Sequence, residues 1–245
     1  MPKIISNQKL TEEFFLLTAR CDNRALAGQF YMLRAWDDYP MLSRPVSVFD
    51  RSDNEVSFLC KKVGKGTELL SRILPGDELS LLGPLGSSFS GATGALAASI
   101  PGSSPKVALV GGGVGIAPLH LAAKQFRLTD PTAVLDIYLG FSDEVILADV
   151  YEKAADELIV NVGGFITDEI DPAGYDYILS CGPEIMMKVL YNKCVSVGKG
   201  ASLWVSMESR MACGIGACLV CSCKTAMGNR KICKDGPVFK ADILW

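Results

Sequence analysis

Two patterns of apolar residues divide the chain. As far as about residue 89, short apolar runs at 29–34, 45–49, 56–60 and 78–82 alternate with turn residues such as those at 75–77 and 83–84. Closely spaced runs with this punctuation are typical of strands in a small antiparallel β-barrel. From residue 106, apolar strand patterns at 107–110, 134–139 and 177–180 alternate with helix patterns at 117–126 and 184–194. This alternation predicts an α/β domain with a parallel sheet and right-handed crossovers.

Two further segments fit neither pattern. Residues 87–104 are rich in Ser, Gly and Ala and poor in large side chains, so we expect a linker or loop there. The tail from about residue 203 to 245 is rich in Cys and Gly and too small to fold on a hydrophobic core alone. This composition indicates that a bound metal ion or cluster stabilises its fold. We therefore expect three domains, at residues 1–102 (barrel), 103–202 (α/β domain) and 203–245 (small Cys-rich domain).

Composition narrows the class of function. Of the 245 residues 49% are hydrophobic, and 24 basic residues face 27 acidic ones, for a net charge of −3. No basic cluster is present, which argues against a nucleic-acid binder. The first residues do not read as a signal peptide, and the longest apolar stretch, 107–123, is interrupted by glycines and a proline. We expect a cytoplasmic protein without a membrane span. The single histidine, His120, is assigned no role.

The cysteines carry the most specific motif. Cys213, Cys218 and Cys221 are spaced C-x4-C-x2-C, and Cys233 follows. This is the spacing of plant-type 2Fe–2S proteins, in which four thiolates converge on two irons. The alternative is a structural zinc site, which prefers paired C-x2-C motifs, and only one such pair is present. Cys223 is an additional thiol close to Cys221, and we interpret it as a cysteine that does not bind the metal.

Two small-residue turns suit a nucleotide. Gly111, Gly112, Gly113 and Gly115 lie between a predicted strand and a predicted helix, where they let a pyrophosphate approach the backbone. A tight connection without ligand is as good an interpretation of that turn alone. The run Cys181, Gly182 and Pro183 follows another strand, so it falls on the same carboxyl edge of the sheet.

A third candidate site lies in the predicted barrel. Arg44, Pro45, Val46 and Ser47 precede by about twenty residues a loop with Gly66 and Thr67. A fixed guanidinium, hydroxyl donors and loop amides are suited to a diphosphate. The ordinary alternative is a turn at the start of a strand.

The order of these motifs resembles the ferredoxin-reductase superfamily. The tail is more specific: residues 207–218 (MESRMACGIGAC) and 233–239 (CKDGPVF) are similar to the family of electron transfer subunits of NAD-dependent dihydroorotate dehydrogenases. The resemblance covers essentially the whole chain. It implies an FAD-binding barrel, an NAD-binding α/β domain and a 2Fe–2S domain.

The resemblance also implies site residues. FAD would contact Arg44, Pro45, Val46, Ser47, Leu59, Cys60, Lys61, Gly66 and Thr67. Cys213, Cys218, Cys221 and Cys233 would ligate the cluster. Gly111, Gly112, Gly113, Gly115, Cys181, Gly182 and Pro183 would line the NAD site.

The function implied is electron transfer in pyrimidine biosynthesis. A partner catalytic subunit containing FMN would oxidise dihydroorotate, which this chain alone could not do, in a heterotetramer of two of each subunit. Electrons would pass through the cluster and FAD to NAD, and no side chain need act as acid or base. Two alternatives are a reductase subunit of another complex, such as a hydrogenase or a ferredoxin-dependent oxidoreductase, and a zinc-stapled nucleotide-binding module without redox activity.

Two finer expectations concern selectivity and docking. Asp143 and Glu144 follow the second strand of the α/β domain, where a carboxylate would bind a ribose 2′-hydroxyl and repel a 2′-phosphate, which favours NAD over NADP. Without the resemblance, a solvated loop carboxylate is an equally good interpretation. Met211, Ile215 and Leu219 form a partly apolar rim of the cluster loop, and we expect the partner subunit to dock there; the ordinary alternative is that they pack in the core.

Overall fold

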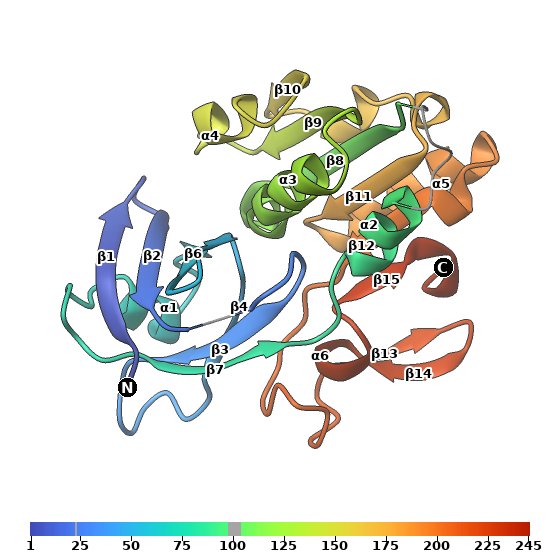
Figure 1. Ribbon diagram of the computed structural model, residues 1–245. Helices are drawn as coiled ribbons and strands as arrows, with labels where there is room; N and C mark the ends of the chain where they lie inside the picture. The colour runs from blue at the N-terminus through green and yellow to red at the C-terminus, as the bar shows by residue number, and fades with distance from the viewer. Residues whose placement is uncertain (23, 98–103) are drawn as a thin grey trace.

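The computed structural model describes residues 1–22, 24–97 and 104–245. It has a β-barrel, a larger sheet covered by helices, and a Cys-rich excursion from that sheet (Figure 1). The two chain ends lie on different parts of the molecule, the first in the barrel and the last beside the larger sheet. This arrangement confirms the fold class that the sequence predicts.

The barrel consists of two antiparallel sheets. The first has the order β1 (Lys3–Lys9), β2 (Phe14–Arg20), β6 (Glu55–Lys61) and β5 (Asp50–Arg51), and the second the order β4 (Arg44–Ser47), β3 (Phe30–Arg34) and β7 (Ser80–Leu85). Buried side chains from both sheets, among them Leu17, Leu33 and Phe58, fill the space between them. The short helix α1 (Lys65–Leu70) follows β6. The four strands predicted in this region are therefore present.

The larger sheet has six strands in the order β10-β9-β8-β11-β12-β15. The first five, β8 (Lys106–Gly112), β9 (Val134–Phe141), β10 (Glu157–Val162), β11 (Tyr177–Cys181) and β12 (Leu203–Ser206), are parallel, and β15 (Val238–Lys240) is antiparallel to β12. Such parallel strands are buried on both faces. Accordingly Val107 and Leu109 belong to one hydrophobic cluster and Ala108 and Val110 to the other.

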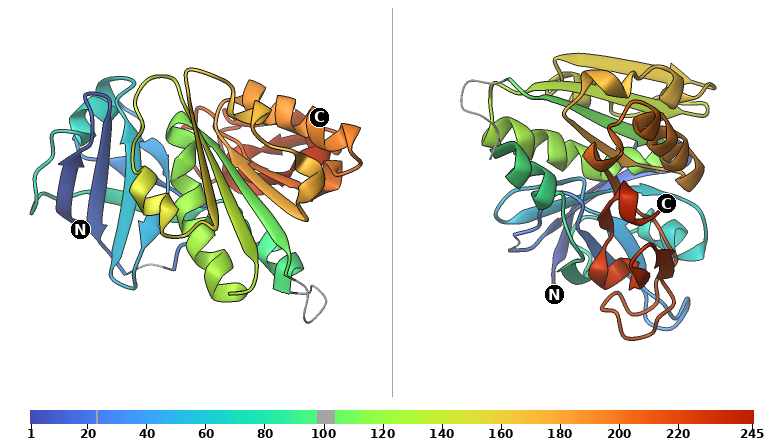
Figure 2. Two further views of the ribbon diagram at one scale, coloured as in Figure 1. Left: turned by 90° about the horizontal axis from the view of Figure 1, so that it is seen from above. Right: turned by 90° about the vertical axis from the view of Figure 1, so that its right-hand side faces the viewer.

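Helices cover both faces of this sheet (Figure 2). Helix α3 (Ala117–Thr129) packs in the cluster that also contains the barrel core, whereas α5 (Glu184–Ser196) packs in the second cluster. The remaining short elements are α4 (Ala148–Glu152) and the 3-10 helices Gly113–Ile116, Ile166–Asp168, Pro172–Gly174, Gly200–Ser202 and Ala241–Ile243. No helix within the described ranges is long and apolar enough to cross a lipid bilayer.

The barrel and the sheet meet at α3. The ring of His120 stacks on that of Phe49, with 4.4 Å between the ring centroids, and its edge meets Tyr151. Beside this stack, Lys124 forms an ion pair with Asp50 at 2.5 Å. These contacts join the two halves of the molecule through one continuous core.

The Ser-, Gly- and Ala-rich segment differs from its expected loop conformation. Residues Ser90–Ala97 form helix α2, and residues 98–103 lie outside the described residues. Small side chains allow this helix to pack closely: Ala92 is fully buried, and a Cβ on Gly91 would lie 2.5 Å from the Trp204 ring. The composition that indicates a linker thus also suits a close-packed helix.

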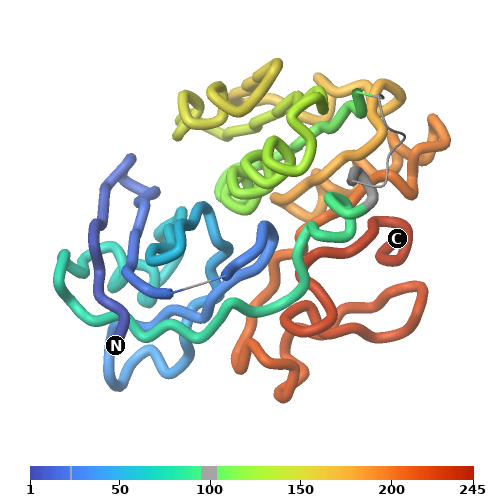
Figure 3. The backbone as a smooth tube through the Cα atoms, viewed as in Figure 1, coloured from blue at the N-terminus to red at the C-terminus, as the bar shows by residue number. Residues whose placement is uncertain are grey.

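The Cys-rich region begins and ends in the large sheet. Between β12 and β15 the chain leaves the sheet, forms the cluster loop and a hairpin of β13 (Ser222–Thr225) and β14 (Gly228–Lys231), and returns through α6 (Ile232–Asp235). The trace in Figure 3 shows this orange and red excursion beside the barrel. The three proposed domain limits therefore stay predictions, with a cluster region that is continuous with the sheet.

Candidate functional site

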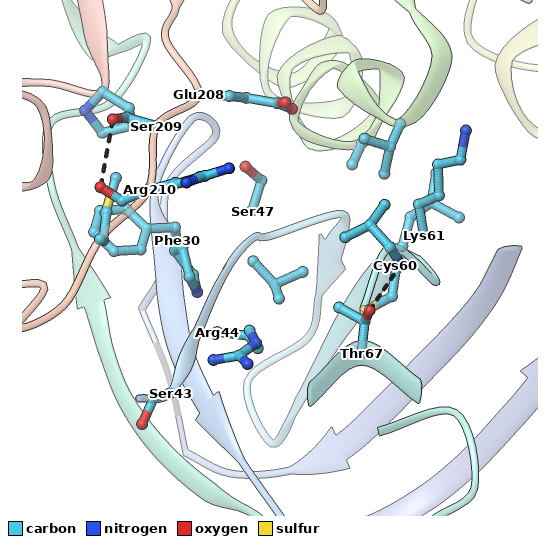
Figure 4. A pocket seen from close by; sticks show the side chains of 18 of the residues that line it. Phe30, Ser43, Arg44, Ser47, Cys60, Lys61, Thr67, Glu208, Ser209 and Arg210 are labelled. Carbon is cyan, nitrogen blue, oxygen red and sulfur yellow. Dashed lines mark hydrogen bonds between the residues drawn. The ribbon is translucent and has the colours of Figure 1, made fainter. Parts of the chain in front are cut away.

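Two cavities lie next to one another where the barrel meets the sheet. The first, which we name the barrel cavity, has a volume of about 810 Å3 and is bordered by β4, β6, the loop before α1, the start of α3 and residues 207–211 (Figure 4). The second, the sheet-edge cavity, measures about 880 Å3 and lies at the carboxyl ends of the parallel strands. Lys61, Val114 and Glu208 line both cavities, so the two spaces share a wall.

The barrel cavity brings together the residues that the resemblance implies as contacts of FAD. Eight of the nine line it, namely Arg44, Pro45, Val46, Ser47, Leu59, Cys60, Lys61 and Thr67. They come together because antiparallel pairing places β4 and β6 in the two sheets that enclose the cavity. The ninth, Gly66, lies behind the wall.

Gly66 provides the space that Arg44 occupies. A Cβ at Gly66 would lie 2.6 Å from Arg44 Cζ and 2.8 Å from Nη2. The guanidinium is also held by a hydrogen bond from Nη1 to the Leu42 carbonyl at 2.6 Å and by stacking over Trp36 at 5.5 Å. A cation fixed in this way on the wall of an open cavity fits an anionic group such as a diphosphate.

The loop beside Arg44 is held by Thr67. Its hydroxyl accepts a hydrogen bond from the Val63 amide at 2.9 Å and donates one to the Gly64 carbonyl at 3.0 Å. These bonds fix the loop before α1 on the first turn of that helix, and the loop borders the cavity.

The sheet-edge cavity divides the predicted nucleotide residues into two groups. Gly112, Gly113, Gly182 and Pro183 line it. Gly111, Gly115 and Cys181 lie behind the wall, and a Cβ on Gly115 would come within 2.5 Å of the backbone at Cys181 and Gly182. The absence of a side chain on Gly115 therefore lets the turn after β8 pack directly against the turn after β11.

Sequence reasoning missed the loop after β10. Gly163, Gly164, Phe165, Ile166, Thr167 and Asp168 all line the sheet-edge cavity. The Gly163-Gly164 pair after a run of apolar residues is a signal that could have identified this loop. The Lys193 ammonium holds this loop in place by donating hydrogen bonds to the carbonyls of Thr167 at 2.5 Å and Ile170 at 3.1 Å.

The acidic group at this cavity differs from the one expected. Among the described residues that line it, Ser142 is present but Asp143 and Glu144 are not. Asp168 provides a carboxylate instead. Strand β10 lies outside β9, and the loop that follows β10 runs back over the ends of β9 and β8 toward α5, which brings Asp168 to the cavity.

Residues 207–211 were also missed as part of the site. Met207, Glu208, Ser209, Arg210 and Met211 all line the barrel cavity. The Glu208 carboxylate lies 4.0 Å from the Cys181 thiol, and burial between the cavity walls raises its pKa. The buried Cys181 thiol likewise has a pKa raised well above its ordinary value by burial. The segment connects β12 directly to the cluster loop.

The four cysteines of the motif form two pairs. Cys213 accepts hydrogen bonds from the amides of Ala217 at 3.3 Å and Cys218 at 3.4 Å. Cys221 accepts one from the Cys233 amide at 3.4 Å, while Cys233 accepts one from Gly216 at 3.1 Å. No disulfide bond joins the cysteines that the structure describes. Two pairs of thiols with amide donors suit two irons with two protein ligands each.

The loop conformation depends on residues with positive φ. Gly214 has φ +72° and Gly216 φ +82°, and a side chain at either would meet Met32 or Lys234 at less than 3.0 Å. Leu219, at φ 64°, adopts the same conformation without being glycine. A non-glycine residue held there stores strain, which is common at ligand-binding loops.

The electrostatics of the loop favour ionised sulfur at one position. Hydrogen bonds from the backbone of Cys218 and Ile215 lower the pKa of the half-buried Cys213 thiol to about 6. Burial raises the pKa of Cys233 to about 12.

Within the described ranges, no three His, Cys, Asp or Glu side chains are grouped as ligands of a single metal ion. Cys223 packs against the second hydrophobic cluster, and its pKa is raised by burial.

The apolar side chains exposed on the cluster loop differ in part from those expected. Ile215 and Leu219 are 56% and 61% exposed, and Val220 adds a further exposed side chain. Met211 is only 8% exposed, because it packs in the second hydrophobic cluster beside Met32, so its expected place on the rim was wrong.

Known proteins resemble this chain along its whole length. Residues 208–244 match the family model described as the iron-sulfur cluster binding domain of dihydroorotate dehydrogenase B. The chain is 43% identical to the "Dihydroorotate dehydrogenase B (NAD(+)), electron transfer subunit" of Clostridium acetobutylicum, over 97% of this chain and 93% of that one. The protein of the same name from Clostridium perfringens is 39% identical over 97% and 94%.

Solved structures agree in fold. A structure described as the NADH-dependent reduced ferredoxin-NADP oxidoreductase superposes with a TM-score of 0.85 at 26% identity and covers 100% of this chain and 90% of that one. The ferredoxin reductase of carbazole 1,9a-dioxygenase gives a TM-score of 0.64 at 22% identity, over 81% and 64% of the two chains.

Proposed function

The chain belongs to the family of electron transfer subunits of NAD-dependent dihydroorotate dehydrogenase B, and we propose on this basis how its residues carry electrons between a partner catalytic subunit and NAD. It is an oxidoreductase subunit with FAD, a 2Fe–2S cluster and NAD as its cofactors, and it acts in pyrimidine biosynthesis. The other two functions considered, a reductase of another complex and a zinc-stapled module, are not favoured by relatives that share this name over nearly the full length.

One structural observation supports this function most strongly. The barrel cavity and the sheet-edge cavity share a wall, and the segment that completes the barrel cavity runs directly into the cysteine loop. When bound, FAD exchanges a hydride with NAD and single electrons with a 2Fe–2S cluster. The chain therefore arranges three sites in the order that this exchange requires.

The barrel residues bind and orient FAD in this proposal. Arg44, held by Gly66 and Trp36, binds the diphosphate through its guanidinium. Thr67 fixes the loop that borders the same end of the cavity. Ser47 lies on the cavity wall nearer the shared residues, where it can donate a hydrogen bond to the flavin ring.

The sheet-edge residues bind NAD. Gly112, Gly113 and Gly182 allow the nucleotide to approach the backbone without obstruction from a Cβ. Asp168 on the wall of this cavity is suited to accept a hydrogen bond from the ribose 2′-hydroxyl and to repel a 2′-phosphate. This assignment transfers the preference for NAD from Asp143 and Glu144 to Asp168.

The cysteine loop holds the cluster. Cys213 and Cys218 form one ligand pair and Cys221 and Cys233 the other, with amide donors directed at three of the sulfurs. Such amide donors stabilise the negative charge on the sulfurs and raise the reduction potential.

The partner is the catalytic subunit of dihydroorotate dehydrogenase B. We propose that it docks on the exposed rim Ile215, Leu219 and Val220, because this rim covers the cluster loop and electron transfer requires the cluster to lie close to the partner's flavin. Two copies of each subunit remain our proposed stoichiometry. We further propose that the chain acts in the cytoplasm, since a chain rich in cysteines that forms no disulfide bond among its described residues suits a reducing compartment.

The test combines the purified chain with its catalytic partner. We expect reduction of NAD by dihydroorotate only when both subunits are present. Substituting Leu219→Asp should abolish this reaction and leave NADH oxidation with ferricyanide unchanged, while Leu128→Asp, at an exposed leucine on α3, should affect neither. Reduction of NAD by the chain alone, or equal effects of the two variants, would contradict the proposal.

A further inference from the structure

The segment between the last parallel strand and the cluster loop places two opposite charges in the barrel cavity. Glu208 and Arg210 are two residues apart, and both line this cavity. The segment is anchored at its start by a hydrogen bond from the Met207 amide to the Pro237 carbonyl at 2.9 Å. Glu208 also lines the sheet-edge cavity, whereas Arg210 does not.

Arg210 differs from the other cations of the cavity in its contacts. Arg44 is bonded to Leu42 and stacked on Trp36, and Lys61 forms an ion pair with Glu13 at 3.0 Å. For Arg210 no ion pair or side-chain hydrogen bond occurs with any residue that the structure describes. Figure 4 shows its side chain extending into the cavity, on the side where Ser47 lies.

The position of Arg210 corresponds to the ring end of the cavity. Arg44 and Thr67 mark one end, which suits a diphosphate. Hydride exchange with NAD requires the flavin ring to lie at the opposite end, where the wall is shared with the sheet-edge cavity and Glu208 stands. Arg210 lies two residues after Glu208, and Figure 4 shows its guanidinium beside Ser47 and not beside Arg44, which places it at the ring end of the cavity and not at the diphosphate end.

We propose that Arg210 sets the reduction potential of the flavin by placing a permanent positive charge beside its ring. This inference rests on the proposed function, because it requires FAD in the barrel cavity. Uptake of two electrons from the cluster and one proton from solvent leaves the ring with one additional negative charge. A guanidinium, which stays protonated, favours that charged form over the oxidised one. Reduction of FAD by electrons from the cluster is thereby favoured.

The experiment measures the midpoint potential of FAD in the full-length chain. Arg210→Gln removes the charge, Arg210→Lys keeps it, and Arg20→Gln removes an equal charge from an exposed strand end outside both cavities. We expect Arg210→Gln to weaken the preference for reduced over oxidised FAD by about tenfold, which corresponds to a potential about 30 mV lower for a two-electron couple. The lysine variant and the Arg20 control should stay close to the unsubstituted chain.

Three results would overturn the inference. An unchanged potential in Arg210→Gln would show that the guanidinium does not act on the ring. Equal shifts in the glutamine and lysine variants would show that charge is not the cause. Loss of bound FAD from Arg210→Lys would mean that Arg210 holds the cofactor instead of biasing its redox state. Failure of the unsubstituted chain to bind FAD would instead refute the proposed function, so the two failures are distinguishable.

Discussion

Replacing Gly66 with alanine tests the diphosphate site without disturbing the fold. The added Cβ would lie 2.6 Å from Arg44 Cζ and 2.8 Å from Nη2, so the guanidinium must leave its place. The side chain is flexible at this end, and the backbone of Gly66 is helical, where alanine is favoured over glycine by up to about 1 kcal/mol. Folding should therefore be as stable as before or slightly more stable.

The magnitude of the effect on FAD follows from the lost contact. A charge-assisted hydrogen bond contributes about 1.5–3 kcal/mol, which corresponds to a Kd for FAD between about tenfold and about 150-fold weaker. Titration of the FAD-free chain with FAD, followed by flavin fluorescence, gives this Kd directly. Thermal unfolding followed by circular dichroism gives the stability of the same samples.

Gly94 provides a matched control away from the site. It lies within helix α2, no atom lies within 4 Å of an added Cβ, and it lines neither cavity. Gly94→Ala should bind FAD like the unsubstituted chain. A Gly66→Ala variant whose Kd stays within about twofold of the unsubstituted chain, or a Gly94→Ala variant that is equally weakened, would refute the role given to Arg44.

Three other predictions concern the cluster, the nucleotide and the domain junction. Cys218→Ser should lose iron and sulfide while Cys223→Ser keeps both, as measured by metal analysis and visible absorption; the reverse result would make Cys223 the ligand. Asp168→Asn should raise kcat/KM for NADPH by about tenfold and leave that for NADH nearly unchanged, and no gain with NADPH would exclude Asp168 from the 2′-position. Burial lowers the pKa of His120 below its ordinary value, so the unfolded chain binds the proton first and stability falls as pH decreases below about 6.5. His120→Phe should flatten this dependence in thermal unfolding between about pH 7.5 and about pH 5.5, and an equally steep decline would contradict it.

The parts of the site that the sequence predicts are those with a local signal. The four residues at 44–47 and the turns at 111–115 and 181–183 each join a recognisable strand pattern to small or charged residues, and each lies at one of the two cavities or directly behind its wall. The cysteine spacing is likewise local. Its pairing into two sets is not local in the same way, because Cys233 reaches Cys221 from helix α6.

The parts that were missed depend on contacts between distant segments. Glu208 and Arg210 reach the barrel cavity only because the four-residue strand β12 joins the sheet and β15 returns more than thirty residues later to pair with it. Asp168 lies at the sheet-edge cavity because the loop after β10 runs back over the ends of β9 and β8. Strand β1 was missed because it has only one fully buried residue, Ile4, in a largely polar run. No local pattern contains this information.

Reduction of the cluster by NADH with and without FAD tests whether the flavin carries electrons between the nucleotide and the cluster. The full-length chain, prepared anaerobically, is treated with NADH, and the cluster is followed by electron paramagnetic resonance. We expect the FAD-loaded chain to develop the signal of a reduced 2Fe–2S cluster and the FAD-depleted chain to remain without it. Equal reduction without FAD, an unreduced cluster in the loaded chain, or zinc in place of iron would contradict this electron path.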